Sequence, residues 1–430
     1  MILCLSAKVN IYPKRYTILQ KCVICRKYIF RLFTHIIPKI LPIVNTDRIF
    51  ASVPIVICAV LCIVCDIQIN TEVTDMSEKY FLGAVSGGRF RTEFEDLIRD
   101  SSRFTYILKG GAGTGKSTMM KRIAEHFEKT HRIIRFCCSS DPSSLDAVVI
   151  PELNSAVCDG TAPHVFEPIY PGICQKYLDL GRFWDSGKLL KDKEKIISAA
   201  DRNRSLLARA QRFTSAAADI CSDTCQLGCD CLLGEKTEAF VKRFEKRLLG
   251  RHGSGTGEKR LLRLTALTEH GFLTMNETLS MPSDRYILHD ELFAASDYLL
   301  SRLADEAISR GYDVILSPEQ MLSDAGYQHL IIPEISAALI GGRYADSSLA
   351  EGAKRINLMR FYDKKALSDR RMRLRMNRAA ADDLTSEAAV TIRTAKSVHD
   401  ELESFYIAAM DFSKLDELTE KVIEEIESRA

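Results

Sequence analysis

The sequence predicts an α/β fold in which a parallel sheet is flanked by helices and the whole unit occurs twice. Three observations favour this fold. A glycine-rich segment joins a short apolar run to a helical pattern, several blocks of sequence recur after about 180 residues, and long amphipathic segments follow in each half. At 430 residues, 46% of them hydrophobic and 27% charged, the chain is long enough for two or three ordinary globular domains.

The glycine-rich segment has a strand before it and a helix after it. Residues 104–108, FTYIL, are β-prone and apolar, which is typical of a buried strand. Apolar residues then recur at helical spacing: Met119, Met120, Ile123, Ala124 and Phe127. Between the two, GGAGTGKST at 110–118 matches G-x-x-x-x-G-K-[ST] in full, the Walker A motif of P-loop NTPases. The alternative is an ordinary glycine-rich turn between a strand and a helix.

This motif predicts a phosphate-binding loop. Glycines let the backbone turn tightly so that its N–H groups point into one concavity, and the first turn of the helix adds unpaired N–H donors. Lys116 is expected to reach the β- and γ-phosphates and Ser117 to ligate Mg²⁺. The predicted ligand is a nucleoside triphosphate, taken as ATP with Mg²⁺. The residues predicted to bind it are Gly110, Gly111, Ala112, Gly113, Thr114, Gly115, Lys116, Ser117 and Thr118.

Residues 1–75 differ from the rest of the chain in charge and hydropathy. Residues 1–48 hold nine Lys or Arg against Asp47 alone, a net +8, so the remainder carries 2 − 8 = −6 and gives no electrostatic case for nucleic-acid binding. Residues 49–65 are uncharged but are interrupted by Pro54 and are short for a membrane span. We interpret residues 1–75 as an upstream extension without a role in function and expect a cytoplasmic protein. A single-span membrane anchor is the alternative.

Fourteen cysteines are present, eight of them after residue 75. Four lie close together, at Cys221, Cys225, Cys229 and Cys231. The spacing C-x3-C-x3-C-x-C is not one of the common zinc or iron–sulfur patterns. Reduced thiols in a helix and its following loop are therefore expected, with a metal site as the alternative.

Blocks of sequence recur at nearly constant offsets. YILKGGAGTGKSTMM at 106 returns in outline as YILHDELFAASDYLL at 286, VVIPEL at 148 as LIIPEI at 330, and LGRFWD at 180 as LMRFYD at 358. A repeat of about 180 residues is too long for a solenoid and fits a pair of domains. We expect an active domain at 76–250, a flexible linker at 251–258 and a second domain at 259–430.

The second copy lacks the loop chemistry. When Tyr106 is aligned with Tyr286, Gly110 is matched by Asp290. In the same alignment Gly115 is matched by Ala295, Lys116 by Ser296 and Ser117 by Asp297. Carboxylates beside a triphosphate would repel it, and no lysine compensates. The second copy is therefore predicted to be degenerate and not to bind a nucleotide in the same manner.

Two further residues of the first copy are candidates for the chemistry. Asp159 follows the apolar run 156–158, as expected of an acidic group near Mg²⁺, and its counterpart is Gly341. His164, a few residues later, is predicted to sense the γ-phosphate or to orient water. The alternatives are a turn at DGT that Asp159 opens and a loop that His164 caps.

Other polar residues are less promising. Glu152 and Arg182 have identical counterparts, Glu334 and Arg360, in the inactive copy, which favours structural roles. Asp141 has no acidic counterpart and is a candidate base-orienting carboxylate, although SSDPS is also a common turn. Long helical patterns cover 188–218, 235–249 and 379–410, and a last one follows a predicted cap at 411–413.

The segments LKGGAGTGKST, CCSSDPSSLDAVVIPEL, DGTAPHVFEPIYPG and LGRFWD together resemble a bacterial family of two-domain P-loop ATP-binding proteins. The resemblance covers residues 76–430 and is looser in the second half. It implies ATP binding through residues 110–118 but does not indicate which substrate the protein acts on. Residues 290–297 depart from the family, in which the second half often also has a glycine-lysine loop.

The sequence thus predicts a Mg²⁺-dependent ATP hydrolase with one active nucleotide site and an inactive twin. One alternative is a nucleotide-sensing scaffold, in which binding alone sets the angle between the halves. The other is a small-molecule or nucleotide kinase, for which Arg202 and Arg204 are the nearest candidate arginines. A small molecule or a protein is expected as a further partner.

Overall fold

The computed structural model describes residues 77–86, 89–92, 99–162, 167–250, 255–322, 326–345 and 347–429. The described residues all belong to one compact unit, Asp75–Ala430. Residues 1–75, including the apolar segment 49–65, lie outside the described residues. No described helix combines the length and the apolar character needed to cross a bilayer.

The first of two six-stranded sheets holds the glycine-rich segment. Its strands are β1 (Glu78–Phe81), β4 (Phe104–Lys109), β5 (Ile134–Cys137), β6 (Leu145–Ile150), β7 (Ser155–Asp159) and β8 (Gln175–Asp179). Their order across the sheet is β1-β5-β6-β7-β4-β8. The central strand β4 runs parallel to both of its neighbours, β7 and β8.

The expectation of a parallel sheet is wrong for one strand, β6, which is antiparallel to both β5 and β7. The reason is the short connection that follows it. Only η3 (Pro151–Leu153) and Asn154 separate β6 from β7. A parallel pair needs a crossover of a dozen or more residues, so this connection allows only a hairpin. The sheets are mixed, with mostly parallel strands.

The second sheet is built from β9 (Lys259–Leu261), β12 (Asp284–His289), β13 (Val314–Pro318), β14 (Tyr327–Ile332), β15 (Ala337–Gly341) and β16 (Lys354–Asn357). Its order is β16-β12-β15-β14-β13-β9, and β14 is antiparallel to both neighbours. When the second sheet is read from β9, each strand has the neighbours and directions of its counterpart in the first.

Small features also match. A two-stranded hairpin follows the first strand of each sheet, β2 (Gly83–Ser86) with β3 (Arg89–Thr92) and β10 (Thr265–Thr268) with β11 (Gly271–Thr274). Asn154 and Ser336, at the ends of η3 and η5 (Pro333–Ile335), both have positive φ angles, 42° and 49°. Non-glycine residues adopt this conformation rarely, so its presence at corresponding positions marks the same turn.

Helices surround the sheets. The α-helices described are α6 (Lys116–Phe127), α7 (Ser186–Lys191), α8 (Lys193–Cys231), α9 (Gly234–Leu248), α10 (Asn276–Ser280), α11 (Ala294–Ser309), α12 (Lys364–Asp369), α13 (Arg371–Ala409) and α14 (Phe412–Glu427). Short 3-10 helices include η4 (Gly181–Phe183), η6 (Ser347–Ala350) and η7 (Leu358–Phe361). The five apolar residues predicted for the face of α6 are all buried, which confirms that pattern.

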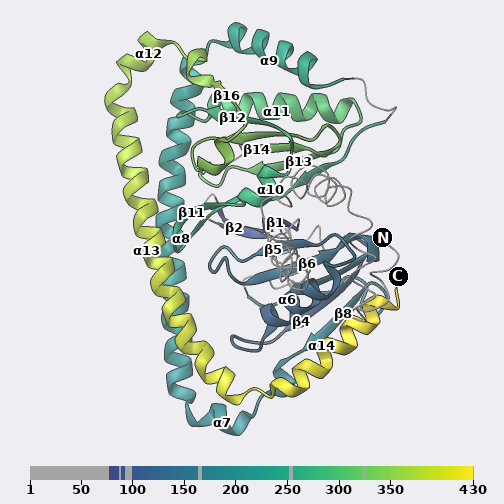
Figure 1. The fold of residues 1–430 in the computed structure, drawn as a ribbon. Coiled ribbons are helices and arrows are strands. Elements are labelled where there is room, and N and C mark those ends of the chain that lie inside the picture. Colours follow the sequence, from purple (N-terminus) through teal and green to yellow (C-terminus); the bar gives the residue numbers. More distant parts are fainter. Residues whose placement is uncertain are drawn as a thin grey trace, which may run out of the picture. The chain divides into compact units, whose positions relative to one another are not determined.

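The longest helices, α8 and α13, have 39 residues each and lie side by side (Figure 1). Ion pairs join Arg209 to Glu387 and Asp223 to Arg373, so the two helices run in opposite directions. Both are longer than the predicted segments. Buried alanines along them allow close approach, because a methyl group needs little room between two helices.

Each long helix ends against the other half. The amide of Asp185 donates to the carbonyl of Ala409 at 2.8 Å, and the amide of Asp363 donates to the carbonyl of Cys231 at 2.8 Å. The helices that follow pack accordingly: α14 shares a core with α6 and the first sheet, and α9 with α11 and the second sheet. The last helix of each predicted domain therefore packs in the core of the other.

The predicted linker at 251–258 is described only from residue 255. There the amide of Gly257 donates to the carbonyl of Ile308 at 2.9 Å, and the amide of Glu258 donates to the carboxylate of Asp313 at 2.7 Å. This end of the segment is hydrogen-bonded to the second half.

Candidate functional site

The glycine-rich loop lies between β4 and α6. Its conformation requires glycine at two positions, because φ is 68° at Gly113 and 80° at Gly115. A Cβ atom at Gly115 would also lie 2.5 Å from Cδ2 of Leu415 on α14. Gly115 caps the start of α6, so the first N–H groups of that helix face the loop.

Lys116 folds back over this loop. Its Nζ donates hydrogen bonds to the carbonyls of Gly110, at 2.8 Å, and Gly111, at 2.9 Å. The Thr114 hydroxyl donates to the Gly111 carbonyl at 2.9 Å. The lysine side chain is 13% exposed, so its charge lies in a partly water-excluded place, where it interacts strongly with an anion.

Asp159 lies beside Lys116. It ends β7, where its Cα is paired with that of Leu108 on β4, and its Oδ2 is 3.6 Å from Nζ of Lys116. Oδ1 accepts hydrogen bonds from the amide and hydroxyl of Thr161, at 2.8 and 2.6 Å. Asp159 therefore opens the turn with one oxygen, which was the alternative interpretation, and turns its other oxygen toward the lysine. Its predicted role near Mg²⁺ stays a prediction.

Ser117 is on the first turn of α6. Its Oγ accepts a hydrogen bond from the amide of Leu145, at the start of β6, at 3.0 Å. A serine oxygen has two lone pairs, so one stays available to a cation. Thr118, the last predicted binding residue, is exposed.

Helix α13 covers the loop, a contact that no sequence pattern predicted. The carboxylate of Glu403 accepts a hydrogen bond from the amide of Gly113 at 3.2 Å. Ala112 packs against a small apolar cluster that contains Ala199 of α8 and Val398 and Leu402 of α13. Glu403 and Gly113 are 290 positions apart, so no local pattern could have linked them.

Trp184 also lies beside the loop. Its ring is 3.4 Å from the place that a Cβ atom of Gly111 would occupy, and it packs against Tyr406 of α13 with 5.2 Å between ring centroids. Its Nε1 is buried and has no hydrogen-bond acceptor among the described residues. An indole N–H usually finds a partner when it is buried, which makes this donor beside the loop unusual.

Two other predicted residues have different outcomes. His164 falls in 163–166, outside the described residues. Asp141 forms the turn that was the alternative, because it accepts hydrogen bonds from the amide and hydroxyl of Ser143 and from the hydroxyl of Ser144. It also lies 3.5 Å from Nζ of Lys396 on α13. Burial raises the pKa of Asp141, but the hydrogen bonds from Ser143 and the Lys396 charge outweigh burial and hold it below its usual value.

The residues assigned structural roles have structural contacts in the second half. Glu334 accepts a hydrogen bond from the amide of Asp313 at 2.9 Å, and Arg360 lies over the ring of Phe361. Arg182 lies over the ring of Phe183 in the same way, 5.1 Å from its centroid. The role of Glu152 stays a prediction.

The second loop is shorter than the sequence comparison assumed. Helix α11 begins at Ala294, after only four residues, whereas six separate β4 from α6. The helix starts then place Phe293, with a φ of 65°, opposite Gly115, Ala294 opposite Lys116 and Ala295 opposite Ser117. The pairing of Lys116 with Ser296 was therefore wrong by two positions, because the loop itself is two residues shorter in the second half. The absence of a lysine is unaffected.

The second loop contains an anion of its own. The carboxylate of Asp290 accepts hydrogen bonds from the amides of Leu292 and Ser296, at 2.9 and 2.8 Å, and from the hydroxyl of Tyr362. That hydroxyl in turn accepts from the amide of Ala295 at 2.7 Å. The N–H groups at this helix start are thus satisfied within the chain, so an external phosphate would have to displace a built-in carboxylate.

The four clustered cysteines all lie within α8, whereas a helix and a following loop were expected. Burial raises the pKa of Cys225 to about 12 and that of Cys221 to about 11, which favours thiols over metal-binding thiolates. No group of three or more His, Cys, Asp or Glu in the described part of the chain is arranged to hold a metal ion.

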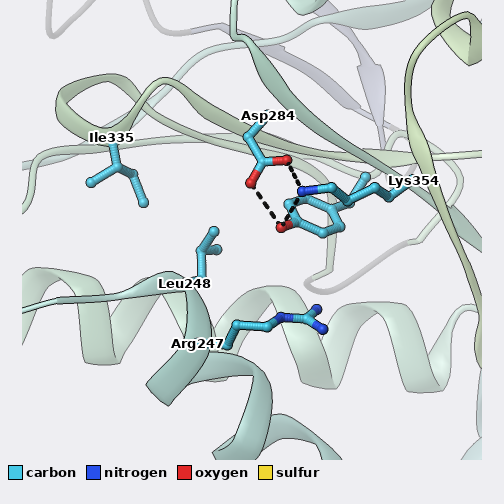
Figure 2. Close-up of a pocket in the computed structure, with 6 residues that line it drawn as sticks. Arg247, Leu248, Asp284, Ile335 and Lys354 are labelled. Carbon is cyan, nitrogen blue, oxygen red and sulfur yellow. Dashed lines mark hydrogen bonds and ion pairs between the residues drawn. The ribbon is translucent and has the colours of Figure 1, made fainter.

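Figure 2 shows a surface cavity of about 340 Å³, and no residue of the glycine-rich loop lines it. Its lining includes Asp284 at the start of β12, Lys354 and Arg247. The carboxylate of Asp284 accepts hydrogen bonds from Lys354, at 2.6 Å, and from the hydroxyl of Tyr286, at 2.8 Å. Ligands of α/β sheets bind beyond the carboxyl ends of the strands, and this cavity is at an amino end.

The glycine-rich loop is therefore the candidate site. It combines a helix N-terminus, a lysine folded back over the loop, a nearby carboxylate and an indole N–H that has no acceptor among the described residues. This arrangement can bind an anion together with a divalent cation. No protein family, curated protein or solved structure matches the chain.

Proposed function

We propose that the protein binds Mg²⁺-ATP at the loop between β4 and α6 and hydrolyses it. The observation that carries the proposal is the position of Lys116. Its ammonium group lies within the loop, hydrogen-bonded to two loop carbonyls and 3.6 Å from Asp159. When a triphosphate enters, the lysine can exchange the carbonyls for phosphate oxygens at little conformational cost.

The loop residues supply the remaining donors. Amides at the start of α6 carry the positive end of the helix dipole, which favours an anion. Mg²⁺ on a triphosphate takes most of its ligands from phosphates and water, so it needs few protein oxygens. Ser117 would supply one directly, and Asp159 would hold the water shell on the other side.

We further propose that the two halves are copies of one P-loop NTPase-like unit and that the second is degenerate. The matching strand orders support duplication, and so do the equivalent hydrogen bonds of Asp185 and Asp363. The Asp290 carboxylate fills the second loop, so one nucleotide is expected for each chain. ATP as ligand favours a cytoplasmic location, as do eight unpaired cysteine thiols in the described residues.

A nucleotide-sensing scaffold is the second candidate. It is favoured by α13, which belongs to the second half of the sequence yet covers the loop of the first, so a ligand in the loop must affect the contact between halves. A kinase has less support. Arg202 pairs with Glu401 and Arg204 with Asp201, on the surface of the long helices.

The experiment is a thermal-shift titration of the full chain with ATP and GTP, each with and without Mg²⁺, followed by a phosphate-release assay. A ligand at a hundred times its dissociation constant adds about 2.7 kcal/mol to the free energy of unfolding. Lys116→Ala should abolish both signals, and Lys121→Ala, an exposed lysine on the same helix, should change neither. Binding of ATP without phosphate release would favour the nucleotide-sensing scaffold over the hydrolase. Absence of binding would contradict both candidates.

A further inference from the structure

The contact between Glu403 and Gly113 joins the two halves at the proposed phosphate site. The carboxylate accepts the Gly113 N–H at 3.2 Å, and α13 is packed so tightly there that a Cβ atom on Gly113 would lie 2.8 Å from the backbone oxygen of Glu403. Glu403 is half-buried. Its position is therefore set by the packing of the helix as well as by its own hydrogen bonds.

Other groups hold this carboxylate in its charged form. Nε2 of His399, one turn earlier on α13, is 3.5 Å from Oε1 of Glu403. The hydrogen bond from His399 lowers the pKa of Glu403, and the Gly113 amide adds to that effect. Two turns from Glu403, Lys396 pairs with Asp141 of the first half at 3.5 Å. The charged face of α13 is thus tied to the first half at two points.

The Gly113 amide belongs to the loop that would surround the phosphates. In a concave loop of this kind, successive N–H groups converge on one anion. Glu403 supplies a negative oxygen to one of these donors, as a phosphate would. A carboxylate and a triphosphate cannot share the donor, because two anions at that distance repel each other.

The second loop provides an internal comparison. There the carboxylate is part of the loop itself, since Asp290 binds the amides of Leu292 and Ser296. When α8 and α13 are aligned from their first residues, the position of Glu403 is occupied by Cys225. Among the described residues, the loop with Lys116 receives its carboxylate from a helix of the other half, whereas the second loop supplies its own.

On the basis of the proposed function, we propose that Glu403 is an internal competitor of the nucleotide. The loop is closed by the Glu403 carboxylate until a triphosphate displaces it. Displacement breaks the contact of α13 with Gly113 and so loosens α13 near the loop. Because α13 continues along α8 to the second half, nucleotide occupancy is coupled to the packing between the halves.

The test compares ATP affinity of the full-length wild type with Glu403→Ala, Glu403→Gln and the matched control Glu401→Ala, by calorimetry in Mg²⁺. Hydrogen bonds to charged groups are each worth a factor of about 10 or more, so Glu403→Ala should bind ATP about 10-fold more tightly. The ATP affinity of Glu403→Gln should lie between those of the wild type and Glu403→Ala, because its uncharged amide oxygen still accepts the Gly113 N–H. Glu401, an exposed neighbour, should have no effect.

A second readout separates competition from a structural tie. Hydrogen exchange should rise in residues 399–407 when the wild type is saturated with ATP, and should already be high in Glu403→Ala without ATP. Equal or weaker affinity of Glu403→Ala, with wild-type binding intact, would overturn the competitor role alone. Unchanged affinity with lost turnover would make Glu403 catalytic instead. If neither wild type nor Glu403→Ala binds any nucleotide, the proposed function fails and the competitor with it.

Discussion

The ammonium group of Lys116 lies 3.6 Å from the carboxylate of Asp159, at the point where strands β4 and β7 end side by side. The parallel pairing of these strands brings the two groups together, because the carboxyl ends of parallel neighbours meet at one edge of a sheet. The loop proposed to bind phosphate thus has an acidic group next to it.

Asp159→Asn should weaken the binding of Mg²⁺-ATP by about 10-fold or more, because a neutral amide cannot balance the cation as a carboxylate does. ATP in the presence of a chelator should bind the variant at least as well as the wild type, since a negative charge has been removed beside the phosphates. Calorimetric titrations with and without Mg²⁺ measure both. Asp201→Asn, at an exposed site on α8, is the control. An unchanged response to Mg²⁺ would argue that Asp159 serves only the turn at Thr161.

Trp184 is the single tryptophan of the chain and should report on the loop. Its ring is in contact distance of Gly111, and its Nε1 has no acceptor in the described structure. Addition of ATP should shift or quench its fluorescence with a saturable dependence on concentration. The change should disappear in Lys116→Ala. A constant spectrum at ATP concentrations that saturate a calorimetric titration would place the ligand elsewhere.

Asp290→Ala should destabilise the protein. The substitution removes the acceptor for the amides of Leu292 and Ser296 and for the Tyr362 hydroxyl, and an unsatisfied buried polar group costs about 1 to 3 kcal/mol. Urea unfolding measures the loss. Asp305→Ala, an exposed aspartate on α11, should change the free energy of unfolding by no more than about 0.5 kcal/mol. Equal stability of the two variants would mean that water replaces the Asp290 carboxylate.

We expect His329 to lower the free energy of unfolding as the pH falls. The amide of Gly341 donates to its Nδ1, so Nε2 carries the proton and donates to the hydroxyl of Thr265. Burial lowers the pKa of His329 from 6.5 to about 3. The folded state therefore favours neutral His329. The contribution of His329 to the free energy of unfolding is fully present above pH 6.5 and is lost as the pH falls from there toward 3. The loss is at most about 1.4 kcal/mol for each pH unit.

The measurement is urea unfolding at pH 7, 6 and 5 for the wild type and His329→Gln. Other groups titrate in both proteins, so the difference between the two slopes isolates His329. The wild type should lose stability more steeply. Parallel slopes would indicate that the histidine is accessible to water or charged in the folded state.

The sequence by itself determined the features whose interactions are local. The strand before the loop, the glycines, the buried face of α6 and the aspartate that ends β7 all follow from neighbouring residues, and all were predicted in place. The antiparallel direction of β6 also follows from the local sequence, since the connection formed by η3 and Asn154 is too short for a parallel crossover. The similar blocks of sequence lie in matching elements of the two halves, such as β4 and β12 or η3 and η5.

Only the tertiary structure decided which helix covers which half. Three features depend on packing between segments far apart in the chain. They are the packing of α9 with the second sheet and of α14 with the first, the hydrogen bonds of Asp290 and Tyr362 in the second loop, and the contact of Glu403 with Gly113. The apolar face of an amphipathic helix does not itself specify which of the two sheets covers it, because burial is non-directional. Hydrogen bonds at the helix ends, such as that of Asp185 with Ala409, accompany the observed arrangement.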